Sequence, residues 1–203
     1  MSSRYLFLDT SYFVTIGLID ENFDFINYQL FENRKGSTIL HKEIYLMLKE
    51  NKMKIKDIDA LIISSGPGSY TGMRLAEGFA QILEIDKLKV FSFYHFEVPK
   101  MIGVTEGWWC SEAFKSEIFV HRWSGEDKEQ NLVKEGEFER KVDINSDNIF
   151  THTGTLLENH FQSTNDLIKK HSKTIFKQVV DRAEHLETYY YRPLEKEFRM
   201  SGQ

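Results

Sequence analysis

The sequence predicts an α/β chain, on three observations. It opens with three β-like runs, at residues 4–9, 12–20 and 23–31, separated by short turns. A helical apolar pattern follows over residues 37–50. Next, a short apolar strand at 60–64 enters a glycine-rich turn and a second helical pattern at 72–85, and another strand follows at 88–93. This βββαβα order is that of an actin-like (ribonuclease H-like, ASKHA) lobe, so we expect that fold.

The residues of each predicted strand and helix in this first lobe favour that element locally. Apolar side chains fall on both faces of the 12–20 run, so we expect both sides of that strand to be covered. Ser37 is a suitable N-cap for the first helix, and Asn51 marks its end. The second helix carries a broad apolar band, made of Leu75, Phe79, Ile82 and Leu83.

Two lobes are expected, an N-terminal actin-like lobe over residues 1–98 and a degenerate C-terminal lobe over 99–203. Pro99 and Gly103 lie in the segment that connects them. Strand-like runs at 102–109, 116–123 and 149–151 belong to the second lobe, and no internal repeat is visible in the sequence.

Composition limits the function. The 203 residues are 41% hydrophobic, which is ample for a core, and the net charge of −5 argues against a protein that mainly grips a phosphate backbone. A single cysteine, Cys110, excludes an intramolecular disulfide and fits a reducing cytoplasm. We find no signal segment and no apolar run of the roughly 20 residues needed to cross a bilayer. The seven histidines include no pair at helical metal-binding spacing, so no metal site is predicted.

The turn between the 60–64 strand and the second helix contains Gly66, Gly68 and Gly72, with Pro67 to stiffen it. A phosphate cradle at the helix N-terminus is one interpretation. However, Thr71 stands where both a Walker A loop and a dinucleotide fingerprint need glycine. The other interpretation is a tight turn that packs the helix closely on the sheet.

The Asp9-Thr10-Ser11 turn ends the first strand, where actin-like ATPases have their first phosphate hairpin. Bulky Tyr12 and Phe13 follow instead of glycines, and no second acidic hairpin is found. We therefore expect no self-sufficient ATP hydrolysis, although Asp9, Thr10 and Gly68 stay as candidates for a cofactor contact. The alternative is a capped β-turn in which Asp9 and Thr10 bond local backbone.

The glycine turn carries the most specific motif of the chain: Gly66, Pro67, Gly68, Ser69, Tyr70, Thr71, Gly72, Met73 and Arg74. It resembles the GPGSFTG-hydrophobic-Arg signature of the TsaB (YeaZ-like) family. Residues 6–11 also resemble that family, and the likeness is continuous over residues 4–98. Beyond that range, the terminal Tyr190-x-Arg192 element resembles the family as well. Departures are Ala76 and Ile82, where the family often has glycine, and Thr188, where it often has proline.

The resemblance implies a non-catalytic, cytoplasmic partner in bacterial tRNA threonylcarbamoyladenosine synthesis. Members dimerise with TsaD, the catalytic relative, or with themselves when it is absent; TsaE engages the complex, and tRNA is contacted only within it. No cofactor of its own is implied, and nucleotide at the interface with TsaD stays open. TsaD has a His-x-x-x-His metal pair in its early helix, whereas this chain offers only His41 there.

The two early helices are the expected interface. Small side chains recur at four-residue spacing on the second helix and would allow another helix to approach closely. The resemblance assigns contact with TsaD to these helices, and the residues expected there are Ile44, Leu48, Gly72, Met73, Ala76 and Ala80. The alternative is that both helix surfaces pack inside the chain itself.

Two further functions stay open. One is an enzyme of the same fold, a small-molecule kinase or a glycoprotease-like hydrolase, that uses Asp9 and the loop at 66–72. The other is a self-associating structural module. Cys110 as a nucleophile has no neighbouring base in the sequence, and a small buried hydrophobe is its more ordinary role.

Overall fold

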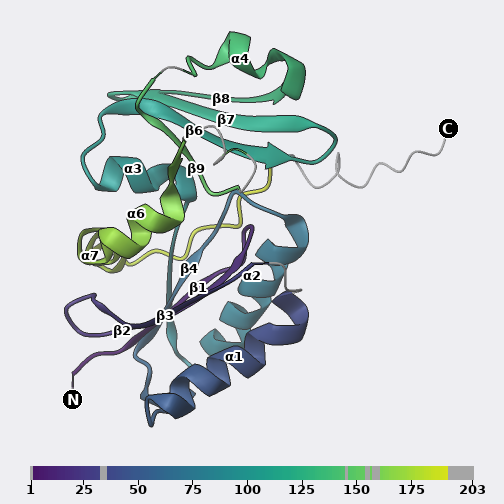
Figure 1. The fold of residues 1–203 in the computed structure, drawn as a ribbon. Coiled ribbons are helices and arrows are strands. Elements are labelled where there is room, and N and C mark those ends of the chain that lie inside the picture. Colours follow the sequence, from purple (N-terminus) through teal and green to yellow (C-terminus); the bar gives the residue numbers. More distant parts are fainter. Residues whose placement is uncertain (1, 33–35, 145, 154–155, 157–160, 192–203) are drawn as a thin grey trace, which may run out of the picture.

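Two five-stranded sheets, one above the other in Figure 1, form the two lobes. The computed structural model describes residues 2–32, 36–144, 146–153, 156 and 161–191. The first sheet contains β1 (Tyr5–Asp9), β2 (Val14–Ile19), β3 (Phe25–Phe31), β4 (Ala60–Ser64) and β5 (Lys89–Phe93), in the order β3-β2-β1-β4-β5. The second contains β6 (Glu106–Ala113), β7 (Glu117–Ser124), β8 (Asp127–Lys134), β9 (Ile149–Thr151) and β10 (Gln162–Ser163), in the order β10-β9-β6-β7-β8.

The two sheets share one topology. In each, the first three strands form an antiparallel meander, and the fourth and fifth strands extend the sheet in parallel from the first strand. The actin-like fold class predicted from the first lobe is therefore confirmed, and the second lobe repeats it without visible sequence similarity.

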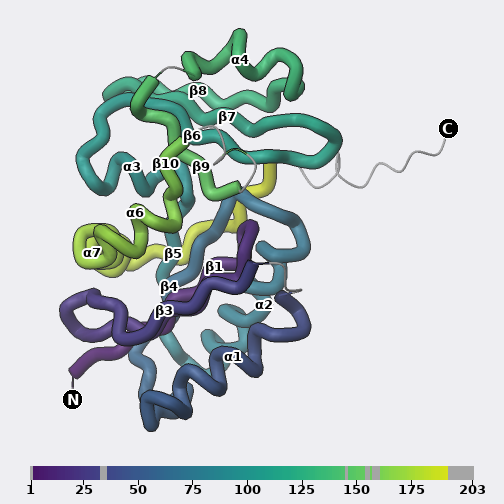
Figure 2. Tube along the Cα trace, viewed as in Figure 1, coloured from purple at the N-terminus to yellow at the C-terminus, as the bar shows by residue number. Residues whose placement is uncertain are grey.

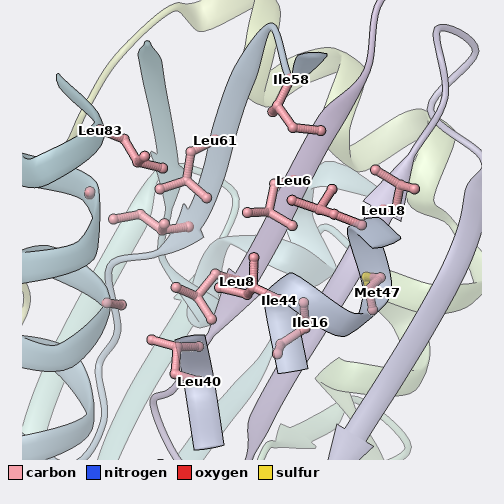
Figure 3. Packing of buried hydrophobic residues seen from close by; sticks show 14 of the residues in the cluster. Leu6, Leu8, Ile16, Leu18, Leu40, Ile44, Met47, Ile58, Leu61 and Leu83 are labelled. Carbon is pink, nitrogen blue, oxygen red and sulfur yellow. The ribbon is translucent and has the colours of Figure 1, made fainter. Parts of the chain in front are cut away.

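One face of the first sheet is covered by α1 (Gly36–Glu50) and α2 (Tyr70–Ile85). Figure 3 shows how leucines and isoleucines of β1, β2 and β4 interlock with α1 and α2 on this side. The opposite face is covered from the far end of the chain, by α6 (Thr164–Lys170) and α7 (Ser172–Arg182). Phe176 of α7 packs on Phe7 at a ring distance of 5.2 Å. Both faces of β2 are buried, as predicted.

Short elements complete the chain, whose path is easiest to follow in Figure 2. They are 3-10 turns at Ile55–Asp57, His95–Glu97 and Glu135–Glu137, and the single-turn helices α3 (Val98–Met101) and α4 (Phe138–Lys141). None of the helices in the described ranges has the length and apolar character needed to cross a membrane.

Several element bounds differ from the prediction. The helix α1 begins at Gly36, so Ser37 lies inside its first turn, and α2 begins at Tyr70, where the Ser69 hydroxyl caps it by accepting from the Gly72 N–H at 3.1 Å. The expected strand at 102–109 begins only at Glu106, because α3 and a turn at Gly103, with φ of +90°, precede it.

Candidate functional site

The glycine-rich turn lies directly on the Asp9–Ser11 turn. The Thr10 hydroxyl donates to the Gly72 carbonyl at 2.6 Å, and the Ser69 N–H donates to the Ser11 carbonyl at 2.7 Å. A Cβ on Gly72 would lie 1.9 Å from the Thr10 carbonyl oxygen, and one on Gly68 would lie 2.6 Å from that of Ser11. Both glycines are therefore needed for close packing of backbone on backbone.

Gly66 is held by a third segment, residues 184–191, which runs along the ends of β4 and β5. The Tyr189 N–H donates to the Ser65 carbonyl at 2.8 Å, and the Leu186 N–H donates to the Ser92 hydroxyl at 2.7 Å. Gly66 has a φ of +100°, and a Cβ there would lie 2.8 Å from the Tyr189 carbonyl oxygen. All three glycines of the signature are thus explained by contacts within this chain, as the tight-turn interpretation requires.

Asp9 ends β1 and points into the space between the lobes, where it pairs with His95. The two side chains are buried, and Asp9 Oδ2 lies 3.0 Å from His95 Nε2. Asp9 Oδ1 accepts from the Ser11 N–H at 2.9 Å. Burial alone would raise the pKa of Asp9, but the charge and hydrogen bond of His95 hold that pKa below its usual value. Asp9 is therefore ionised.

Hydrogen bonds on both nitrogens hold the ring of His95 in place. The Thr164 hydroxyl donates to the Thr151 carbonyl at 3.1 Å, so it accepts from His95 Nδ1–H at 3.2 Å. On the other side of the ring, His95 Nε2 lies 3.0 Å from Asp9 Oδ2. His95 and Asp9 thus form a buried histidine–carboxylate pair.

The second lobe contributes His152, whose ring lies 4.5 Å from that of His95. Burial, together with the charge of His95, holds the pKa of His152 well below its usual value, so His152 is neutral. Its Nε2 lies 3.3 Å from the Ser111 hydroxyl, which also bonds the Tyr191 hydroxyl. Residues of both lobes and of the C-terminal segment therefore meet in one buried polar cluster.

The geometry of this cluster does not match a hydrolase relay. In a Ser-His-Asp relay the carboxylate and the hydroxyl bond opposite nitrogens of the imidazole. Here Asp9 Oδ2 and the Ser11 hydroxyl both approach His95 Nε2 at 3.0 Å, and all three residues are buried. Within the described part of the chain, no group of three or more acidic, histidine or cysteine side chains is arranged to hold a metal.

A cavity of about 480 Å³ opens beside the cluster, lined mainly by aromatic rings. Tyr70 of the signature lies in its wall and contacts Tyr190 with ring centroids 5.3 Å apart and tilted by 40°, while the Arg74 guanidinium lies over the Tyr70 ring at 5.3 Å. Arg192 lies outside the described residues. Pro67 and Met73 are buried and Thr71 and Arg74 are exposed, so the signature is partly internal and partly on the surface.

The expected interface residues lie mainly inside the chain. Ile44, Leu48, Ala76 and Ala80 belong to the core between α1, α2 and the first sheet. Exposed apolar side chains on the same two helices are Tyr45, Ile82 and Ile85, at 61%, 57% and 81% exposure.

Cys110 is also buried, and burial raises the pKa of its thiol. His95 and His152 were not predicted as site residues, because they come from separate segments that only the tertiary fold brings together.

Comparisons with known proteins agree with this architecture. Residues 32–91, from the segment before α1 into β5, match the family model of TsaD, described as tRNA N6-adenosine threonylcarbamoyltransferase. YeaZ from Pseudomonas aeruginosa superposes with a TM-score of 0.63 at 18% identity, covering 92% of this chain and 99% of YeaZ. The chain has the YeaZ fold.

A second solved structure with the YeaZ fold is titled an uncharacterized protein with similarity to peptidase YEAZ, also from Pseudomonas aeruginosa. It gives a TM-score of 0.65 at 18% identity, covering 94% of this chain and 100% of that one. No curated protein sequence matches the chain. The YeaZ fold and the match over residues 32–91 support the resemblance to the TsaB (YeaZ-like) family, which rests on the glycine-turn signature.

Proposed function

We propose that this chain is a non-catalytic partner subunit in tRNA threonylcarbamoyladenosine synthesis. It would bind TsaD and support transfer of threonylcarbamoyl to the adenosine beside the anticodon. The observation that carries this proposal is the buried pairing of Asp9 with His95, in a chain that has the YeaZ fold. The match of residues 32–91 to the TsaD family supports the same pathway.

The pairing bears on catalysis because Asp9 is the carboxylate that a nucleotide-binding actin-like lobe would turn toward magnesium. Here that carboxylate already has a partner, because its Oδ2 lies 3.0 Å from His95 Nε2. A phosphate would also approach the neighbouring glycines. The space beside their Cα atoms is already occupied by the backbone of Thr10, Ser11 and Tyr189. Both features favour a subunit that leaves the chemistry to TsaD, over a kinase or hydrolase that acts alone.

The exposed apolar face of α1 and α2 is the surface we assign to TsaD. Tyr45 and Ile82 lie outside the core that these helices form with the first sheet, and so are available to a partner. The same face would serve a homodimer when TsaD is absent. TsaE and tRNA would then be engaged only through the complex, with any nucleotide at its interface, in the cytoplasm.

The test mixes this protein with TsaD from the same organism and measures the mass of the assembly by size-exclusion chromatography with light scattering. Ile82→Arg should abolish the complex. Ile26→Arg is the matched control, because Ile26 is 44% exposed on β3. A complex that also restores threonylcarbamoylation of tRNA by TsaD would support the proposal.

Three results would contradict it. They are the absence of any complex under all nucleotide conditions, equal loss of binding in both variants, and ATP hydrolysis by the isolated chain that disappears in Asp9→Ala. The last result would favour the enzyme alternative.

A further inference from the structure

We propose that a second cavity between the lobes, lined by Lys100, His121 and Lys128, binds a phosphate group. The cavity has a volume of about 310 Å³. Its walls come from the segment after β5, from β7 and β8 of the second sheet, and from α7. None of its lining residues belongs to the aromatic-lined cavity beside Asp9, and the inference does not depend on the proposed function.

A chain of hydrogen bonds fixes the proton of His121. The Tyr189 hydroxyl donates to Gln130 Oε1 at 2.6 Å, so the other end of that amide, Nε2, donates to His121 Nδ1 at 3.0 Å. Since Nδ1 accepts, the proton of the neutral ring lies on Nε2. Among the described residues this N–H has no hydrogen-bond partner, although His121 is only 2% exposed.

The ring itself cannot easily turn away. It stacks on Phe96 with centroids 4.5 Å apart, and Trp123 lies on it at 6.0 Å. Although the ring is buried, its Nε2–H is not fully enclosed by protein and is accessible where His121 lines the cavity. A ligand in the cavity can therefore accept from this N–H.

The positive charge around the cavity indicates that the group accepting from His121 is an anion. Lys100 and Lys128 both line the cavity, and no ion pair of either lysine is found within the described ranges. Burial first, and then the charges of Lys128 and Lys100, lower the pKa of His121 to about 4. Both lysines line the same cavity as the imidazole, so their charges act on the same space.

The remaining polar groups leave that charge uncompensated. Glu97 is the carboxylate in the described lining, and it is paired with Arg182, whose Nη1 lies 3.1 Å from its Oε1. The Lys100 ammonium donates to the Gly125 carbonyl at 3.1 Å, which holds it at the rim. Two lysines and an N–H donor around a space of this size suit a tetrahedral oxyanion.

The experiment records the ring signals of His121 by NMR while inorganic phosphate is added to the full chain. We expect saturable shifts and a rise in the pKa of His121, since a bound anion offsets the lysine charges. Lys128→Ala and Lys100→Ala should each weaken binding about tenfold, the loss of one charge-assisted hydrogen bond. Lys56→Ala, an exposed lysine far along the sequence on another element, is the control and should bind as the unmodified protein does.

A parallel titration with an anticodon stem-loop RNA identifies the source of the phosphate. Binding of RNA alone, weakened by the same two variants, would assign the cavity to a backbone phosphate. Binding of inorganic phosphate at equal strength would assign it to a free phosphate group. The inference is overturned if neither ligand moves the His121 signals, or if the lysine variants bind like Lys56→Ala.

Discussion

Replacing Asp9 by alanine should destabilise the whole fold. The change removes the carboxylate from the buried pair with His95 and leaves the Ser11 N–H without its acceptor. Breaking a buried ion pair by removing one partner costs about 3–5 kcal/mol, because the other charge stays buried. At about 2–4 °C per kcal/mol for a chain of this size, the Tm should fall by roughly 6–20 °C.

Two variants make this measurement specific. Asp9→Asn keeps an oxygen for the Ser11 N–H and offers an N–H to a neutral imidazole, so it should lose much less stability than Asp9→Ala. Asp24→Ala removes an aspartate from an ion pair with Lys173 that is exposed on both sides, and it should leave the Tm almost unchanged.

The assay is thermal unfolding followed by circular dichroism, with urea unfolding at 25 °C to give the free energy. The reasoning would be refuted if Asp9→Ala melted within about 2 °C of Asp24→Ala, since breaking a buried pair should cost more than about 1 kcal/mol. A variant that melts normally but loses an ATPase activity would place Asp9 in an active site instead.

Other consequences follow from the same contacts. Below pH 6.5, His152 and His121 become protonated in the unfolded chain but stay neutral in the folded chain, because their folded-state pKa values are lowered. The free energy of unfolding should therefore fall as the pH drops, by up to about 1.4 kcal/mol per pH unit for each ring. For His121 this loss should continue down to about pH 4. Gly72→Ala should cost about 3 kcal/mol, because its Cβ meets the Thr10 carbonyl. The Cys110 thiol should resist alkylation until the chain unfolds, which a thiol titration with and without urea measures.

Each of these three predictions can be contradicted by a specific result. His41→Gln, on an exposed ring, should leave the acid slope unchanged, and a stability that is level from pH 6.5 to 4.5 would contradict the assignment of neutral buried histidines. Gly136→Ala meets nothing within 4 Å and should be tolerated; equal losses at both glycines would remove the steric argument. Rapid alkylation of the native chain would show that Cys110 is accessible.

The sequence predicts the first lobe well where patterning is strong. The strand at 60–64 is apolar up to Ile63 and is followed by the glycine turn, and β4 has those bounds. In the second lobe, β8 went unrecognised because most of its residues are polar and exposed, as suits an edge strand with no apolar alternation. The two-residue β10 is too short to leave any periodic signal.

The candidate site is harder for sequence because its partners are far apart. Asp9 follows a recognisable strand, but His95 comes 86 residues later and His152 belongs to the other lobe. A search for two histidines one helical turn apart cannot find such a set. Similarly, the small residues Ala76 and Ala80 mark a close helix contact, yet only coordinates show that the contact is with the chain's own core.

The buried cluster brings together residues of both lobes. Asp9 ends a strand of the first sheet, His95 follows its last strand, and His152 follows β9 of the second sheet. Thr164 joins these groups to the start of α6, whose helix packs back on the first sheet. The pair of Asp9 and His95 therefore lies within the first lobe, and the contacts of His95 with His152 and Thr164 connect it to the second. A carboxylate held in this way is occupied by protein contacts, which agrees with a subunit that presents α1 and α2 to a partner and leaves the chemistry to it.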